Sequence, residues 1–246
     1  MIILALESSA GACSAALSRD GELAAQFYAH SGLTHSRTLL PMVESMLENS
    51  GVTLDEVDVI AVAAGPGSFT GLRIGVATAK GLAWKGDKLC APCSTLESMA
   101  WPLAHMEGSL IVCAMDARRG QVYNALFLAT GEGLERLSPD RAITLAELGE
   151  ELREYKNSKI VVGDGAKLCY NTLMEQGLTL RLAPLPLRMQ SAWGVALAAR
   201  RLADRDGLVR GGALIPVYHR LSQAERERLA REEKRNKNDK GEQAHV

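Results

Sequence analysis

Residues 65–71 carry the clearest chemical signal in the sequence. They read Gly-Pro-Gly-Ser-Phe-Thr-Gly after an apolar run, which predicts a strand, a tight turn and the start of a helix. The free N–H groups of a helix N-terminus bind anions such as phosphate. The dinucleotide fingerprint has one residue fewer before its third glycine, and it places an acid at the end of the next strand, whereas Asp87 precedes that strand. No Lys-Ser or Lys-Thr follows the glycines, as a P-loop requires. The segment predicts either nucleotide binding or a turn that allows close helix packing.

A second polar segment, Glu7-Ser8-Ser9, follows the first apolar run and precedes a predicted hairpin. Actin-like ATPases place a phosphate-binding loop at this position, with an acid for the metal and small hydroxyl side chains for phosphate. We therefore predict a vestigial nucleotide site at Glu7, Ser8 and Ser9. The alternative is a polar turn with no ligand.

Other sets of catalytic residues are missing from the sequence. The five histidines show no HxxxH or HExxH spacing, and GxSxG does not occur. Cys90 and Cys93 have CxxC spacing but lie in an apolar run with no second pair, which favours buried thiols over zinc or redox chemistry. We therefore predict no catalytic residues, no metal and no cofactor.

Composition narrows the class of protein further. The chain has 246 residues with 28 Lys and Arg against 29 Asp and Glu, so its formal net charge is −1. A protein that binds nucleic acid mainly by charge is basic, and 4% aromatic residues argue against a base-stacking surface. An odd number of scattered cysteines is typical of reduced thiols. No signal peptide or membrane-spanning run is visible, so we predict a cytoplasmic protein without membrane contact.

The order of expected elements predicts two α/β lobes. Strands are expected at 1–6, 13–17, 23–28, 57–64 and 89–93, with helices at 36–49, 71–84 and about 95–103. A second series begins near Ser109, with strands at 110–115, 121–128 and 160–162 and helices at about 145–155, 166–177 and 192–204. We assign residues 1–101 to the first lobe, 102–220 to the second and 221–246 to a charged, disordered tail. The role of the hairpin with Asp116, Arg118 and Arg119 is left open.

Two helices of the first lobe have unusually wide apolar faces. The helix at 36–49 covers an arc of about 160° with apolar residues, more than a helix needs to cover one sheet. The helix at 71–84 has only Arg73 and Lys80 as charged residues. We predict that both helices dock on a partner protein; burial by the second lobe is the alternative. The predicted contact residues are Leu39, Met42, Val43, Met46, Gly71, Leu72, Gly75, Val76, Ala79 and Ala83.

Several motifs at their mutual spacing resemble the TsaB family. They are LALESSAGACSAAL, HSRTLLPMVESML, AVAAGPGSFTGLRIGVATAKGLAW, STLESMA, DARRGQVYNALF and PVYHR, which together extend over residues 1 to about 220. TsaB, also named YeaZ, is the small subunit of the bacterial machinery that makes tRNA threonylcarbamoyladenosine. The resemblance implies a two-lobed fold of the actin-like, Hsp70-like ASKHA type, with mixed sheets flanked by helices.

The resemblance also implies a partner-dependent role. TsaB-like chains are non-catalytic paralogues of the transferase TsaD and dock on it through the two helices above. An ATPase, TsaE, joins them, and TsaD modifies N6 of adenosine 37 in tRNAs that read ANN codons. TsaD has a metal-binding HxxxH where this chain has residues 94–98, Ser-Thr-Leu-Glu-Ser. We expect contact with tRNA only through the complex, and a homodimer when the chain is alone.

Two enzymatic alternatives stay open at this point. One is an actin-like enzyme that binds and hydrolyses ATP by itself. The other is a metalloprotease of the glycoprotease type, which would need a catalytic metal or a nucleophile set that the sequence does not display.

Overall fold

The first lobe is built on a mixed six-stranded sheet of order β12-β5-β4-β1-β2-β3. The computed structural model describes residues 1–219, so the predicted tail lies outside the described residues. Strands β1 (Ile2–Glu7), β2 (Cys13–Arg19) and β3 (Glu22–Ala29) form the predicted antiparallel meander. Strands β4 (Val59–Gly65) and β5 (Leu89–Ser94) extend it in parallel from β1.

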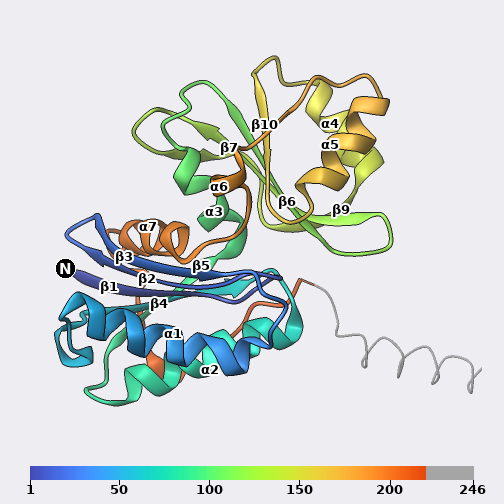
Figure 1. Ribbon diagram of the computed structural model, residues 1–246. Helices are drawn as coiled ribbons and strands as arrows, with labels where there is room; N and C mark the ends of the chain where they lie inside the picture. The colour runs from blue at the N-terminus through green and yellow to red at the C-terminus, as the bar shows by residue number, and fades with distance from the viewer. Residues whose placement is uncertain (220–246) are drawn as a thin grey trace, which may run out of the picture.

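Helices cover both faces of this sheet (Figure 1). Helices α1 (His35–Ser50) and α2 (Phe69–Trp84) lie on one face, and α7 (Ala192–Ala203) lies on the other. Apolar residues alternate between the two faces along β1, so that Leu4 and Leu6 face α1 and α2 while Ile3 and Ala5 face α7. A strand buried on both faces explains the continuous apolar run at the start of the sequence.

The second lobe repeats the plan on a smaller scale. Its sheet has the order β11-β10-β6-β7-β8, and β9 also pairs with β7. The strands are β6 (Leu110–Asp116), β7 (Gln121–Ala129), β8 (Leu134–Arg136), β9 (Arg141–Thr144), β10 (Lys159–Val162) and β11 (Arg181–Leu182). Helices α4 (Leu145–Arg153) and α5 (Ala166–Glu175) cover one face, and α3 (Thr95–Ala100) lies on the other, packed against β6 and β7.

The lobe boundary differs from the prediction at the C-terminal end. Residues 102–220 were all assigned to the second lobe, but α7 packs on the first sheet, where Val195 and Ala199 join Ala61 and Ala91 in one cluster. Strand β12 (Val209–Arg210) pairs antiparallel with β5 and completes the first sheet. An alanine-rich helix can approach a sheet closely, but its sequence does not specify which sheet. The two-lobed α/β fold itself is confirmed.

Short connecting helices complete the structure. They are η1 (Leu54–Glu56), η2 (Trp101–Leu103), α6 (Leu185–Arg188) and η3 (Gly211–Ala213). All five cysteines are unpaired and buried, including Cys90 and Cys93. No helix within residues 1–219 combines the length and the apolar character needed to cross a bilayer.

Candidate functional site

A cleft of about 570 Å³ opens between the two lobes and gathers the motifs with chemical potential. The first lobe contributes the β1–β2 loop and the start of α2, and the second lobe contributes the β6–β7 hairpin and the turn before α5. The lining residues are Ser9, Ala10, Gly11, Gly67, Ser68, Phe69, Thr70, Met115, Asp116, Ala117, Arg118, Tyr123, Asp164, Val217, Tyr218 and His219. The fold therefore brings residues 7–11, 65–71 and 116–120 together, although they are far apart in the sequence.

The predicted nucleotide loop lies beneath this cleft rather than in it. Glu7, Ser8 and Ser9 are all at most 1% exposed. The Ser8 hydroxyl donates to the carbonyl of Gly71 at 3.0 Å, and the Ser68 backbone N–H donates to the Ser9 carbonyl at 2.7 Å. A ligand in the cleft can touch the edge of Ser9, but it reaches neither the Glu7 carboxyl nor the Ser8 hydroxyl. The interpretation of these three side chains as a phosphate site is thus not supported by their placement.

Glu7 is a buried carboxyl with incomplete hydrogen bonding. Its Oε1 accepts the Ser9 backbone N–H at 2.5 Å, but its Oε2 has no partner among the described residues, and neither has Ser9 Oγ. Burial raises the pKa of the Glu7 carboxyl to about 7, against the opposing effect of the Ser9 hydrogen bonds. Glu7 is therefore largely protonated below neutral pH, which makes it a poor metal ligand there.

The raised pKa of Glu7 predicts a pH-dependent stability. In the folded chain the carboxyl binds a proton up to about pH 7, whereas in the unfolded chain it loses the proton near pH 4.5. Between these values the folded state holds more protons, so its stability falls as pH rises, by about 3 kcal/mol in total. We expect Glu7→Gln, which stays neutral, to be more stable than the wild type above pH 7 and to lose that advantage towards pH 4.5. Thermal unfolding across this range, with the wild type as reference, measures the effect. A stability difference that does not vary with pH would contradict the assignment.

The rim of the cleft carries charges of both signs. The Asp116 carboxylate accepts the backbone N–H of Arg118 at 2.7 Å and so closes the turn of the β6–β7 hairpin. Burial raises the pKa of the Asp164 carboxyl, the charge of Asp116 raises it further, and a hydrogen bond from Gln190 at 2.9 Å opposes both. Two carboxylates at the rim disfavour a polyphosphate. The hairpin with Asp116 and Arg118, whose role the sequence left open, thus forms one wall of the cleft.

The C-terminal part of the described chain crosses the Gly-Pro-Gly turn. The Val217 N–H donates to the Ala64 carbonyl at 2.7 Å, and the Tyr218 ring stacks on Phe69 with centroids 4.5 Å apart. The Arg73 guanidinium lies over the Phe69 ring at 4.0 Å, and its Nε donates to the Tyr218 hydroxyl at 3.1 Å. Sequence reasoning did not assign a position to this segment, since it has no periodicity; the PVYHR motif was its only signal.

The predicted docking residues turn out to be core residues of the first lobe. Nine of the ten are buried against the chain's own sheet, and Met42 is partly buried: Leu39, Val43, Met46, Gly71, Leu72, Gly75, Val76, Ala79 and Ala83 are the nine. A Cβ at Gly75 would lie 2.5 Å from Ser8 Oγ and 3.2 Å from Val62 Cγ2. The lack of a side chain at Gly71 and Gly75 therefore lets α2 approach the sheet and the β1–β2 loop closely. The nine buried residues are not accessible to a partner, whereas the opposite faces of the same helices carry exposed residues.

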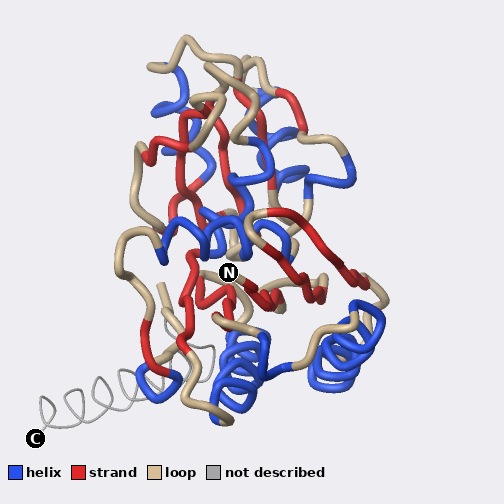
Figure 2. The backbone as a smooth tube through the Cα atoms, turned by 90° about the vertical axis from the view of Figure 1, so that its left-hand side faces the viewer, coloured by secondary structure: helices blue, strands red, loops and turns tan. Residues whose placement is uncertain are grey.

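Those opposite faces are accessible and lie side by side at one end of the molecule (Figure 2). On α2 the exposed stripe consists of Thr70, Ala77, Gly81 and Trp84, and the Trp84 side chain is 89% exposed. On α1 the side chain of Leu40 is 42% exposed. The two cations of α2 are bound to the C-terminal segment, Arg73 through Tyr218 and Lys80 through the carbonyl of Gly212 at 3.3 Å. Arg73 is itself exposed and borders the stripe, whose residues are uncharged and, apart from Trp84, small.

Relatives with curated functions match most of the chain. The tRNA threonylcarbamoyladenosine biosynthesis protein TsaB of Bacillus subtilis is 34% identical over 92% of this chain and 96% of its own length. The protein of the same name from Escherichia coli is 34% identical over 74% of this chain and 79% of its own length. The chain belongs to the TsaB family. The resemblance seen in the sequence motifs is thereby confirmed.

Solved structures and a family model agree with membership of the TsaB family. YeaZ from Pseudomonas aeruginosa superposes with a TM-score of 0.73 at 27% identity, covering 88% of this chain and all but 1% of its own. A protein described as similar to peptidase YeaZ, also from Pseudomonas aeruginosa, gives a TM-score of 0.76 at 26% identity, covering 89% of this chain and 99% of its own. The family model for TsaD, tRNA N6-adenosine threonylcarbamoyltransferase, matches residues 30–177.

In this TsaB-family chain, the segment at 94–98 has a structural role. The Ser94 hydroxyl caps α3 by accepting the Glu97 N–H at 3.1 Å and donates to the Asp140 carboxylate at 2.6 Å. Arg136 then pairs with both Glu97 and Asp140 at 2.8 and 2.6 Å. Among residues 1–219, no group of three or more histidine, cysteine or acidic side chains is placed to hold a metal ion. Through these contacts the segment at 94–98 joins the two lobes.

Proposed function

We propose that this chain is a non-catalytic subunit that docks on a TsaD-like transferase and supports threonylcarbamoylation of N6 of adenosine 37 in tRNAs that read ANN codons. A TsaE-like ATPase would join this complex, and tRNA would be engaged through it. The observation that carries the proposal is the burial of Glu7, Ser8 and Ser9 in a chain of the TsaB family. Because these three polar side chains are buried beneath the cleft, they are not available to bind a phosphate group, which suits a supporting subunit better than an enzyme. A tRNA substrate implies a cytoplasmic location.

The docking surface in this proposal is the outer face of α1 and α2. The small side chains of Thr70, Ala77 and Gly81 would let a partner helix approach α2 closely, and Trp84 and Leu40 would supply apolar area. A stable interface needs about 800 Å² from each partner, which two four-turn helices can provide. In the absence of the transferase the same face would pair with a second copy of this chain as a two-fold homodimer.

Assays of the purified chain test the proposed lack of catalysis. We expect no threonylcarbamoyl transfer to tRNA, no peptide cleavage and no ATP hydrolysis with divalent metal present. Addition of a TsaD-like transferase and a TsaE-like ATPase from the same cell should then produce modified tRNA. Metal-dependent ATP hydrolysis by the chain alone that Glu7→Ala eliminates would instead favour an actin-like enzyme, with the loop opening to admit the nucleotide.

A further inference from the structure

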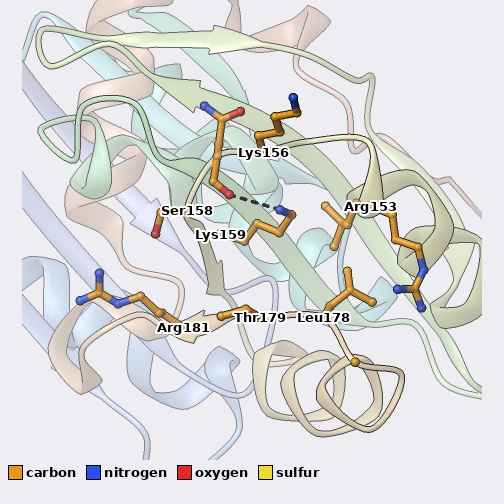
Figure 3. Close-up of a pocket in the computed structure, with 10 residues that line it drawn as sticks. Arg153, Lys156, Ser158, Lys159, Leu178, Thr179 and Arg181 are labelled. Carbon is orange, nitrogen blue, oxygen red and sulfur yellow. Dashed lines mark hydrogen bonds between the residues drawn. The ribbon is translucent and has the colours of Figure 1, made fainter.

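A pocket of about 620 Å³ in the second lobe shares no lining residue with the interlobe cleft (Figure 3). It is formed where α4 and α5 end and where β10 and β11 begin. Ten residues line it, of which Arg153, Lys156, Lys159 and Arg181 are cationic and none is acidic, in a chain whose overall net charge is −1.

The four cations differ in how they are compensated. Arg153 donates to the Gln176 carbonyl at 2.8 Å and pairs at 3.4 Å with Glu150, which lies outside the pocket lining. The Lys159 ammonium donates to the carbonyls of Tyr155 and Asn157 at 2.5 and 3.2 Å, and its partial burial lowers its pKa. Lys156 and Arg181 are exposed, and no hydrogen bond or ion pair joins either side chain to the described residues.

This arrangement has the chemistry of a phosphate-backbone site. Lysine provides a point charge and arginine a planar fork that fits two phosphate oxygens. The hydroxyls of Ser158 and Thr179 could bind further phosphate or sugar oxygens, whereas the Asn157 amide donates to the Gly108 carbonyl at 2.9 Å. The lining contains no aromatic residue on which a base could stack, so it would bind the backbone without selecting a sequence.

The position of the pocket leaves it free when α1 and α2 are covered. Figure 1 places α4 and α5 in the lobe opposite to α1 and α2, so that a transferase docked on those helices would not cover the basic pocket. We propose that this pocket binds the phosphate backbone of the tRNA in the assembled complex, at a distance from the modified base. This inference rests on the proposed function, and it adds a direct RNA contact to the subunit. Four cations neutralise few phosphates, so the contact is weak without the rest of the complex.

The test measures tRNA binding by the assembled complex with Lys156→Ala and Arg181→Ala combined. Because both cations are exposed and without protein partners, the variant should fold and assemble normally. We expect affinity for tRNA to fall about tenfold near physiological salt, and the slope of log affinity against log salt to decrease by about 2. The matched control combines Lys167→Ala and Arg205→Ala, which remove the same charge from exposed positions elsewhere. The control should bind as the wild type does.

Further measurements distinguish a failure of docking from a failure of the pocket to bind tRNA. Light scattering of the complex without RNA reports the docking on its own, so a failure of the proposed function is seen separately from a failure of the pocket. Titration of the isolated chain with tRNA at low salt tests the pocket even if no complex forms, and the double variant should then bind more weakly than the control. Unchanged tRNA affinity and salt slope in both settings would overturn the proposal. The proposal would also be overturned if ATP or pyrophosphate stabilised the wild-type chain against thermal unfolding while the double variant bound tRNA as tightly as the wild type. The pocket would then bind a small phosphate compound and not tRNA.

Discussion

Ala77→Glu is expected to abolish docking on a TsaD-like transferase while leaving the fold intact. Ala77 is exposed in the middle of α2, between Thr70 and Trp84 on the uncharged stripe beside Arg73. Glutamate is a good helix former, so the isolated chain loses little stability. In an interface the new carboxylate would be buried without a partner, which costs several kcal/mol. Because about 1.4 kcal/mol corresponds to a tenfold change in affinity, the affinity should fall by a factor of about 100 or more. Isothermal titration of the transferase with this variant measures the loss.

The control for this variant makes the same change on another helix. Ala146 is exposed on α4 in the second lobe, so Ala146→Glu adds the same charge far from the proposed docking face. It should bind the transferase as the wild type does. If Ala77→Glu bound with unchanged affinity, the outer face of α2 would not be the docking surface. If the isolated Ala77→Glu chain is a folded monomer in solution, the homodimer uses the same face of α2.

Gly71→Ala should lower the melting temperature by about 10 °C. A Cβ at Gly71 would lie 2.1 Å from the Ser8 carbonyl oxygen, which is a backbone atom that cannot rotate away. The helix start and the β1–β2 loop must then separate, which also weakens the hydrogen bond from the Ser8 hydroxyl to Gly71. Overpacking of this kind costs about 3 kcal/mol, and a domain of this size shifts by about 2–4 °C per kcal/mol.

Gly81→Ala supplies the opposite case on the same helix. No atom lies within 4 Å of a Cβ at Gly81, so the methyl group meets no obstacle. Replacement of glycine by alanine inside a helix then stabilises by up to about 1 kcal/mol, because the unfolded chain loses conformational freedom. Differential scanning calorimetry of both variants should give shifts of opposite sign. Equal shifts would show that the turn and the loop are not in the contact described.

The elements with strong local patterns could be predicted from the sequence. The meander of β1 to β3 follows from one continuous apolar run and two further apolar segments separated by turns, and a capping box of Thr144 with Glu147 begins α4. The two-residue strands β11 and β12 could not be predicted, since pairing with a neighbouring strand, not their own pattern, makes them strands. The assignment of α7 to the wrong lobe has the same origin, because only tertiary contacts decide which sheet an alanine-rich helix covers.

The candidate sites show a similar division. Gly71 and Gly75 were predicted to contact a partner, but small residues allow close approach of a partner helix and of the chain's own sheet equally well. The polar types of Glu7 and Ser8 suggested a ligand loop, whereas the fold closes that loop with the Gly-Pro-Gly turn. The basic pocket was not visible in the sequence, since Arg181 joins Lys156 only through the parallel pairing of β10 and β11.

Hydrogen exchange of the chain, with and without a TsaD-like transferase, tests the central claim most directly. The claim is that the outer faces of α1 and α2 form the docking surface of a supporting subunit. We predict that binding slows exchange in peptides from residues 35–50 and 69–84 and leaves α4 and α5 unchanged. Protection confined to the second lobe, or to α7, with α1 and α2 exchanging as in the free chain, would contradict the account.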